Sequence, residues 1–314
     1  MRVAVLFFEG SEKKVEVVVK SGTPSLRALG QDYWSELVAC CGATILSHIS
    51  NDQMDAYLLS ESSLFVWPDR LLMITCGNIT LVDSVIHFLD QQGQGCVDMI
   101  TYQRKNEYQS HLQKTAFEED VERLNLRLPG KAFRLGHLDG HHNYVWHMDK
   151  VYQPVEDDIT TELLMYHIEG EAADYLRGSD QTIEGIRQHL QLDALFPEFE
   201  FDEFLFEPFG YSMNAIRGDQ YITMHITPQD GTSYVSFETD IDIPNECPEL
   251  LNRFTDILNP SSFDLITFNA DPKIALQPDV ACVAHNQQQL KCGFKMEFQH
   301  FIKMAKNIGP ALEI

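Results

Sequence analysis

Strand-like segments joined by short turns recur along this chain, and they restrict the folds that it can adopt. Residues 55–66 and 71–77 have the aromatic and β-branched character of strands and flank a turn at residues 67–70, and residues 219–241 form a second hairpin. Short turns join antiparallel neighbours, whereas parallel strands need long crossovers. With amphipathic helices between the hairpins, the pattern predicts antiparallel sheets covered by helices, an α+β architecture.

The helices are recognised by apolar side chains at three- and four-residue spacing. In residues 32–43, Trp34, Leu37, Val38 and Cys41 share one face, and a glycine follows as a stop. Further helices are expected at residues 80–95, 117–128, 169–177, 182–192 and 248–258, with a last helix at residues 298–308.

The two halves of the chain are organised in a similar way, each with strands and interspersed helices. Residues 56–66 weakly resemble residues 232–241, which suggests an internal duplication. No low-complexity linker separates the halves, so we expect residues 1–314 to form a single domain.

Composition excludes several classes of function. The 23 basic and 47 acidic residues give a net charge of −24, which repels nucleic acid and anionic membranes and suits a cationic ligand. No apolar run reaches the roughly 18 residues of a membrane helix, and the N-terminus lacks a secretory signal, so we expect a cytoplasmic protein. The seven cysteines include no CxxC pair and are expected to be reduced thiols.

Ser-Glu-Ser-Ser at residues 60–63 interrupts an otherwise apolar, strand-like run. Taken alone, this stretch indicates a turn or bulge, because serine hydroxyls bond readily to nearby backbone. Cys76 at the end of a strand could be catalytic or structural. Glu9 and Glu12 could act in acid–base chemistry, and His225, on the polar face of a strand, could be a surface residue.

Four histidines near a predicted hairpin, at residues 131–149, raise the question of a metal site. The hairpin turns at residues 139–140, which would leave the two histidines at the turn exposed and place one on a strand. The sequence therefore predicts no metal site for His137, His141, His142 and His147. It also contains no phosphate-binding glycine loop, GxSxG or HExxH motif.

Five motifs together resemble the eukaryotic-type S-adenosylmethionine decarboxylases in their order and approximate spacing. They are FFEGSEK from Phe7, YLLSESSLFV from Tyr57, ITCG from Ile74, PFGYSMNAI from Pro208, and HITP followed by SYVSFET from His225. The resemblance implies a four-layer α/β/β/α sandwich of two antiparallel sheets. It also gives residues 60–63 a function beyond that of a turn.

The resemblance implies that the chain cuts itself between Glu61 and Ser62, giving chains of residues 1–61 and 62–314. Ser62 would be converted to an N-terminal pyruvoyl group, the covalent cofactor, with help from Ser212 and His225. The pyruvoyl would form a Schiff base with S-adenosylmethionine and accept electrons as CO2 leaves, and Cys76 would return a proton to Cα. Phe8 and Phe206 correspond to rings around the adenine, Glu9 and Glu12 to active-site carboxylates, and Glu61 to a substrate contact.

Two departures from the family pattern bear on ligands. Gln229 stands where the family has a glutamate that binds the ribose hydroxyls, so it retains one acceptor without the charge. Animal members bind putrescine in an acidic cavity, but Ile74 and Thr101 replace a lysine and an aromatic residue of the animal pattern. Putrescine remains a hypothesis, with a cavity lining that corresponds to Glu16, Asp158, Thr160, Glu162 and Glu238.

The leading prediction is thus a decarboxylase that supplies aminopropyl groups for spermidine synthesis. A pyruvoyl-dependent decarboxylase of another amino acid and a non-catalytic, regulatory paralogue are the alternatives. Ser62, Cys76, Ser212 and His225 are all present, which speaks against the paralogue. The family contains monomers and dimers, so the sequence leaves a monomer or a homodimer open.

Overall fold

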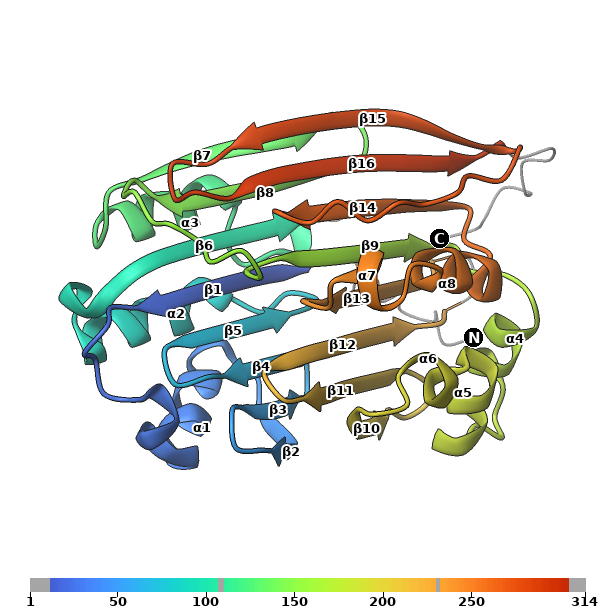
Figure 1. Cartoon of the computed structure of the whole chain (residues 1–314), viewed down its shortest axis with the longest axis horizontal. Coiled ribbons are helices and arrows are strands. Elements are labelled where there is room, and N and C mark those ends of the chain that lie inside the picture. The colour runs from blue at the N-terminus through green and yellow to red at the C-terminus, as the bar shows by residue number, and fades with distance from the viewer. Residues whose placement is uncertain (1–11, 107–109, 230–231, 305–314) are drawn as a thin grey trace.

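The computed structural model describes residues 12–106, 110–229 and 232–304 (Figure 1). Phe8 and Glu9 therefore lie outside the described residues. Two eight-stranded antiparallel sheets, one from each half of the chain, lie face to face. This arrangement confirms the predicted α+β sandwich.

Sheet A is built from the first half of the chain. Its strands are β1 (Lys13–Val19), β2 (Ile45–Ser50), β3 (Asp55–Leu59), β4 (Ser62–Val66), β5 (Arg70–Thr75), β6 (Val97–Lys105), β7 (Gly130–Gly136) and β8 (His142–Met148). They are ordered β2-β3-β4-β5-β1-β6-β8-β7, so the first strand of the chain lies in the middle of the sheet.

Sheet B is built from the second half. Its strands are β9 (Thr160–Tyr166), β10 (Glu200–Leu205), β11 (Tyr211–Arg217), β12 (Gln220–Thr227), β13 (Tyr234–Thr239), β14 (Ser262–Phe268), β15 (Val280–Gln289) and β16 (Lys295–Lys303). The order β10-β11-β12-β13-β9-β14-β16-β15 repeats that of sheet A with each number raised by eight. This repeat is what an internal duplication would produce, but the weak sequence likeness was misplaced. Residues 56–66 form β3 and β4, whose counterparts are β11 and β12, and residues 232–241 contain β13.

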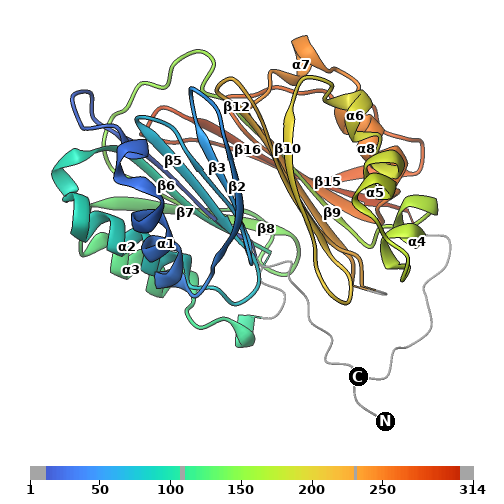
Figure 2. The same ribbon diagram turned by 90° about the horizontal axis from the view of Figure 1, so that it is seen from below.

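Helices cover the outer face of each sheet, which gives the four layers seen in Figure 2. On sheet A they are α1 (Gly30–Cys41), α2 (Leu81–Gln92) and α3 (Phe117–Asn125); with sheet B lie α4 (Glu171–Arg177), α5 (Ile183–Leu190), α6 (Leu192–Leu195), α7 (Ile243–Glu246) and α8 (Leu250–Leu258). Short 3-10 turns occur at Leu26–Leu29, Gln94–Cys96 and Ser110–Leu112. α1 ends at Gly42, which takes the left-handed conformation with φ 96°, as the sequence predicted.

Each sheet has an apolar outer face and a more polar inner face. On β12, Ile222, Met224 and Ile226 pack into the core beneath the helices of sheet B. Tyr221 belongs to a different cluster, shared with sheet A, and Thr223 bonds to sheet A. The two-residue strand period thus directs the polar side chains of β12 into the space between the sheets. Candidate catalytic residues gather in that space.

Two expectations from the sequence are wrong. Residues 298–303, predicted as the start of a last helix, lie in strand β16. The histidines of the β7–β8 turn were expected to be exposed, but His142 is buried and the side chain of His141 is only 15% exposed. Both lie against residues of other strands, which the local hairpin pattern does not contain.

None of the described helices is long and apolar enough to cross a membrane.

Candidate active site

Ser62 begins β4 directly after the turn from β3, and its backbone is strained. Its φ of 140° is a conformation that residues other than glycine rarely adopt. The residue is completely buried, and its Oγ has no hydrogen-bond partner among the residues that the structure describes. A buried, unpartnered hydroxyl costs free energy, and so does the backbone strain. Ser62 is therefore held in a high-energy arrangement by the surrounding sheet.

The carbonyl of Glu61 is held by the strand next to β4. The backbone N–H of Cys76 donates a hydrogen bond to this oxygen at 2.9 Å. Ser62 pairs with Thr75 across β4 and β5, so Cys76, the next residue, lies opposite the Glu61–Ser62 peptide. This N–H points at the oxygen on which negative charge would develop if the Glu61 carbonyl were attacked.

Ser63 anchors the same segment to the opposite sheet. Its hydroxyl donates to Asn214 Oδ1 at 2.6 Å and lies 2.9 Å from Thr223 Oγ1. Asn214 and Thr223 are themselves paired across β11 and β12. The second serine of the motif therefore fixes β4 against sheet B.

Ser212 and His225 form the adjacent pair on the same face of β11 and β12. They lie opposite each other, one rung of about 7 Å from Asn214 and Thr223. Ser212 Oγ is hydrogen-bonded to His225 Nδ1, and Nε2 is buried with no partner among the described residues. Burial lowers the pKa of His225 from 6.5 to about 4, and the negative charge of Glu12 offsets only part of this effect. The imidazole is thus a neutral base at neutral pH.

Glu12 lies in the same buried region. Its side chain is fully buried, forms an ion pair with Lys105 at 2.5 Å and accepts a hydrogen bond from Tyr234 at 3.4 Å. Burial raises the pKa of Tyr234 well above its usual range, and the charges of Glu12 and Cys76 add to this rise. These couplings bring Glu12, Cys76 and His225 together with Tyr234, a residue that the sequence did not single out.

The first part of the predicted diamine lining is already paired with lysines. Lys14 Nζ lies 2.9 Å from Glu162 Oε1 and 2.7 Å from Glu238 Oε1, and Lys105 Nζ lies 2.7 Å from Glu162 Oε2. All four side chains are buried. Burial would raise the pKa of Glu162, but the two lysines outweigh it and lower the pKa to about 2. Burial raises the pKa of Glu238 to about 7 in spite of the lysines.

The second part of the lining is paired with an arginine. The Arg70 guanidinium lies 3.5 Å from Glu16, Asp158 and Asp240. These contacts lie at one end of the sandwich, where Arg70, Asp158 and Asp240 help to line an acidic cavity of about 1150 Å³. Thr160, also predicted for the lining, is buried at the start of β9. The four acidic residues of the predicted lining therefore form two groups, one paired with Lys14 and Lys105 and the other with Arg70.

Comparison with known proteins identifies the family. The adenosylmethionine decarboxylase family model matches residues 6–307. The chain belongs to this family. This membership confirms the resemblance that the five motifs indicated.

Curated relatives are named S-adenosylmethionine decarboxylase proenzyme. Those of Leishmania donovani and Drosophila melanogaster are 32% and 30% identical to this chain over 284 and 287 residues. The alignments cover 85% and 83% of this chain and 74% and 82% of those proteins. The crystal structure of the Trypanosoma brucei AdoMetDC-delta26 monomer is similar to this structure, with a TM-score of 0.58 and 22% sequence identity. The alignment covers 77% of this chain and 99% of the other chain, and it supports the fold.

The remaining predicted substrate residues of this family member lie on loops at one end of sheet B. Phe206 precedes β11, where its ring packs edge-to-face on Phe204 at 4.8 Å, and Gln229 follows β12. Because Tyr211 pairs with Ile226, both loops are at the Ser212–His225 end of their strands. The Gln229 amide oxygen accepts a hydrogen bond from the Thr232 hydroxyl at 3.3 Å.

Several contributors were missed by sequence reasoning. Strand alternation places Asn214 on the face of Ser212, and Lys14 on the face of Glu12 and Glu16. That signal was available and would have drawn attention to both residues. The remaining contributors, Ser63, Lys105, Arg70 and Tyr234, matter through contacts between strands that are distant in sequence.

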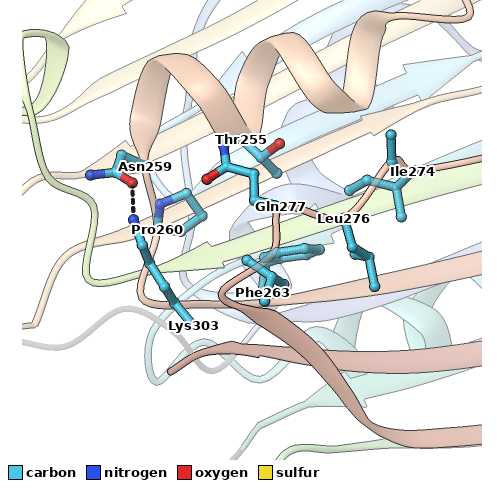
Figure 3. Close-up of a pocket in the computed structure, with 10 residues that line it drawn as sticks. Thr255, Asn259, Pro260, Phe263, Ile274, Leu276, Gln277 and Lys303 are labelled. Carbon is cyan, nitrogen blue, oxygen red and sulfur yellow. Dashed lines mark hydrogen bonds between the residues drawn. The ribbon is translucent and has the colours of Figure 1, made fainter. Parts of the chain in front are cut away.

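A small hollow elsewhere in sheet B has a different character. It lies beside α8 and is lined by apolar side chains such as Phe263, Ile274 and Leu276 (Figure 3). At its rim, Lys303 Nζ donates to Asn259 Oδ1 at 2.6 Å. None of the described site residues lines this hollow, so it is separate from the candidate active site.

Proposed function

We propose that this protein is a self-processing S-adenosylmethionine decarboxylase that carries a pyruvoyl group made from Ser62. The observation that carries the proposal is the strained, fully buried Ser62, whose Oγ has no partner among the described residues and whose preceding carbonyl, that of Glu61, accepts a hydrogen bond from the Cys76 N–H. A serine that is only a turn residue needs neither feature. The curated relatives of this protein are named proenzymes, which agrees with self-processing.

The residues present suit the cleavage. Ser62 Oγ attacks the carbonyl carbon of Glu61, the C–N bond breaks, and an ester replaces the amide while the Ser62 nitrogen becomes a free amine. The Cys76 N–H stabilises the oxyanion of this step. Relief of the strain at Ser62 favours the forward direction.

The second stage needs a base, and His225 is neutral and available. It removes the Ser62 α-proton, the Cβ–Oγ bond breaks, and Glu61 leaves as a carboxylate. Water hydrolyses the resulting dehydroalanine, ammonia is released, and residues 62–314 begin with a pyruvoyl group. Ser212 holds His225 through Nδ1 and leaves Nε2 for the proton.

The mature site would then decarboxylate its substrate. When present, the pyruvoyl supplies a ketone that binds the substrate amine and accepts the electrons released as CO2 leaves. Cys76 is the proposed proton donor to substrate Cα. Phe206 offers a ring to the adenine, and Gln229 offers one acceptor to the ribose hydroxyls. The product would supply aminopropyl groups for spermidine synthesis.

We also propose that this enzyme acts without putrescine. Lys14 and Lys105 already neutralise Glu162 and lie against Glu238, and Arg70 is paired with Glu16 and Asp158. A diamine would have to displace these buried cations, which are fixed by the chain itself. The two positions that depart from the animal pattern, Ile74 and Thr101, are both buried in sheet A.

Intact mass under denaturing conditions tests the processing. Wild type should give two species, residues 1–61 and a remainder of 253 residues (314 − 61) with a pyruvoyl terminus. Ser62→Ala should remain a single chain, and the control Ser60→Ala, whose hydroxyl accepts the Thr44 N–H, should be cut normally. A single uncut chain in wild type would contradict the proposal that the protein processes itself without a partner.

A second assay separates the substrates. CO2 release from S-adenosylmethionine by the cut protein supports the proposal. Release from another amino acid instead would show that the pyruvoyl assignment holds and the substrate assignment does not.

A further inference from the structure

A second buried cluster lies between the sheets, outside the residues assigned to the reaction. It consists of His141 from the β7–β8 turn, Asp264 from β14 and His300 from β16. One imidazole nitrogen of each histidine and one carboxylate oxygen all lie within 4.8 Å of one another. The sequence pattern had grouped His141 with its neighbours in the chain, whereas its partners here are more than one hundred residues away.

Both imidazoles point the same nitrogen at the same carboxylate. His300 Nδ1 lies 2.7 Å from Asp264 Oδ1, and His141 Nδ1 lies 3.0 and 2.9 Å from Oδ1 and Oδ2. The two rings are stacked, with centroids 3.7 Å apart and an interplanar angle of 20°. The stacking holds both Nδ1 atoms beside the same carboxylate, so that the three potential ligand groups face one another.

The carboxylate is oriented by two further donors. Asn106 Nδ2 donates to Asp264 Oδ2 at 2.6 Å, and the Tyr166 hydroxyl donates to the same oxygen at 3.2 Å. Asn106 also accepts the backbone N–H of His142 at 2.8 Å through its Oδ1, which fixes the turn that carries His141. Outer partners that orient both a carboxylate and a histidine-bearing loop are characteristic of metal sites.

The backbone makes the group rigid. Asp264 and His300 are directly paired on β14 and β16, so their separation is fixed by the sheet. The third member comes from sheet A, where the edge strand β7 lies beside β15 and β16 (Figure 1) and the Gly136 N–H donates to Asn286 Oδ1 at 2.8 Å. Asp264 is fully buried and His300 is 8% exposed, whereas the His141 side chain, 15% exposed, leaves a route for an ion.

We infer that His141, Asp264 and His300 form a binding site for a borderline divalent ion of the zinc class, which cross-links the two sheets. Two imidazoles and one carboxylate are a ligand set that such ions use, with a fourth position left to water. Metal–ligand bonds of about 2.0–2.2 Å place ligand atoms about 3.3–3.5 Å apart in a tetrahedral site. The present separations from Asp264, 2.7 Å to His300 and 2.9 to 3.0 Å to His141, are shorter than this, so both imidazoles would rotate away from the carboxylate when an ion binds.

The site also has a physical connection to the catalytic cluster. Tyr166, which holds Asp264, pairs with Tyr234 across β9 and β13, and their rings lie 5.3 Å apart. Tyr234 in turn donates to Glu12. An ion bound to Asp264 would therefore stiffen the side of the site on which Glu12 lies.

Cobalt titration of the full-length protein, freed of metal with a chelator, tests the site directly. We expect a visible ligand-field spectrum that saturates at one Co2+ per chain and disappears when Zn2+ is added. No saturable binding at this stoichiometry would overturn the assignment and leave the cluster as a hydrogen-bonded contact between the sheets. The uncut Ser62→Ala protein serves equally well, so the outcome does not depend on the proposed reaction.

Two variants locate the ion. His141→Gln, on a partly exposed turn, should weaken Co2+ binding at least 10-fold. His137→Gln, an exposed histidine on the same hairpin, is the matched control and should bind like wild type. Chelator should lower the melting temperature of wild type and of the control but not that of His141→Gln. Unchanged affinity in His141→Gln would show that the ion binds elsewhere and would contradict the site.

Discussion

The Ser212 hydroxyl on β11 and His225 Nδ1 on β12 are hydrogen-bonded across adjacent strands, and the opposite ring nitrogen is left in a buried space between the sheets. This relationship fixes which nitrogen of His225 can act as a base. It also places the proposed base on sheet B, whereas Ser62, the proposed source of the pyruvoyl group, lies on sheet A.

Replacement of the base should stop processing after its first stage. For His225→Gln we expect cleavage to be slowed at least 100-fold, because His225 is the proposed base for the Ser62 α-proton and an amide cannot take its place. The measurement is the fraction of cut chain against time by denaturing mass spectrometry. His111→Gln, at an exposed position, should be processed at the wild-type rate. Equal rates in both variants would exclude His225 as the base.

The pH dependence of processing follows from the same residue. Because burial lowers the pKa of His225 to about 4, the imidazole is neutral from pH 8 down to about pH 5. The rate of cleavage should therefore be flat between about pH 6 and 8 and fall as the pH approaches 4 and the base is protonated. Cleavage rates in buffers across this range test the prediction. A midpoint near 6.5 would indicate a solvated histidine instead.

Cys76 should matter for turnover and not for processing. Cys76→Ala keeps the backbone N–H that bonds to the Glu61 carbonyl, so we expect normal cutting. CO2 release should fall at least 100-fold, since the thiol is the proposed proton donor. Both quantities can be measured on one preparation, with Cys40→Ala, an exposed thiol, as the control. If Cys76→Ala were cut poorly but its cut fraction released CO2 at the normal rate, Cys76 would be needed for processing and not as the proton donor.

The buried lysines predict a change in the response to diamine. Wild type should release CO2 at the same rate with and without putrescine. Lys14→Met leaves Glu162 and Glu238 with one cation fewer, which is costly for buried carboxylates, so its activity should fall roughly 10-fold and putrescine should restore it.

Lys20→Met, an exposed position just after β1, is the matched control for that test and should behave like wild type. Activation of wild type by putrescine would show that the lysines do not replace the diamine. Failure of putrescine to restore Lys14→Met would show that the cavity does not admit it.

Strand periodicity predicted the parts of this fold that depend on local pattern. The polar face of β12 is an example, since Thr223 and His225 follow from alternation alone. The prediction of a last helix was wrong because it also used local pattern alone. Phe298, Phe301 and Ile302 fit helical spacing, whereas Met296, Phe298 and His300 fit a strand. Pairing with β14 and β15 decides between the two, and a single segment does not contain that information.

The candidate site was predictable where its residues are contiguous in the sequence. It was not predictable where residues from distant strands come together in the fold. Residues 60–63 stand out in the sequence, but the strain at Ser62 and the contact from Ser63 to Asn214 exist only once the sheets meet. Lys14 shares a strand face with Glu12, yet its pairing with Glu162 and Glu238 depends on the register of β9 and β13.

The position of β1 in the middle of sheet A has a consequence for the life of the protein. Cutting after Glu61 would assign β1 to the short chain, while both of its neighbours, β5 and β6, remain in the long chain. The fragments would stay together as a stoichiometric pair, because neither can leave without breaking the centre of a sheet. Refolding would then require two chains to meet, so it would become dependent on concentration. Maturation would thus be a one-way event, and a fully denatured enzyme could not repeat the single-chain folding from which it came.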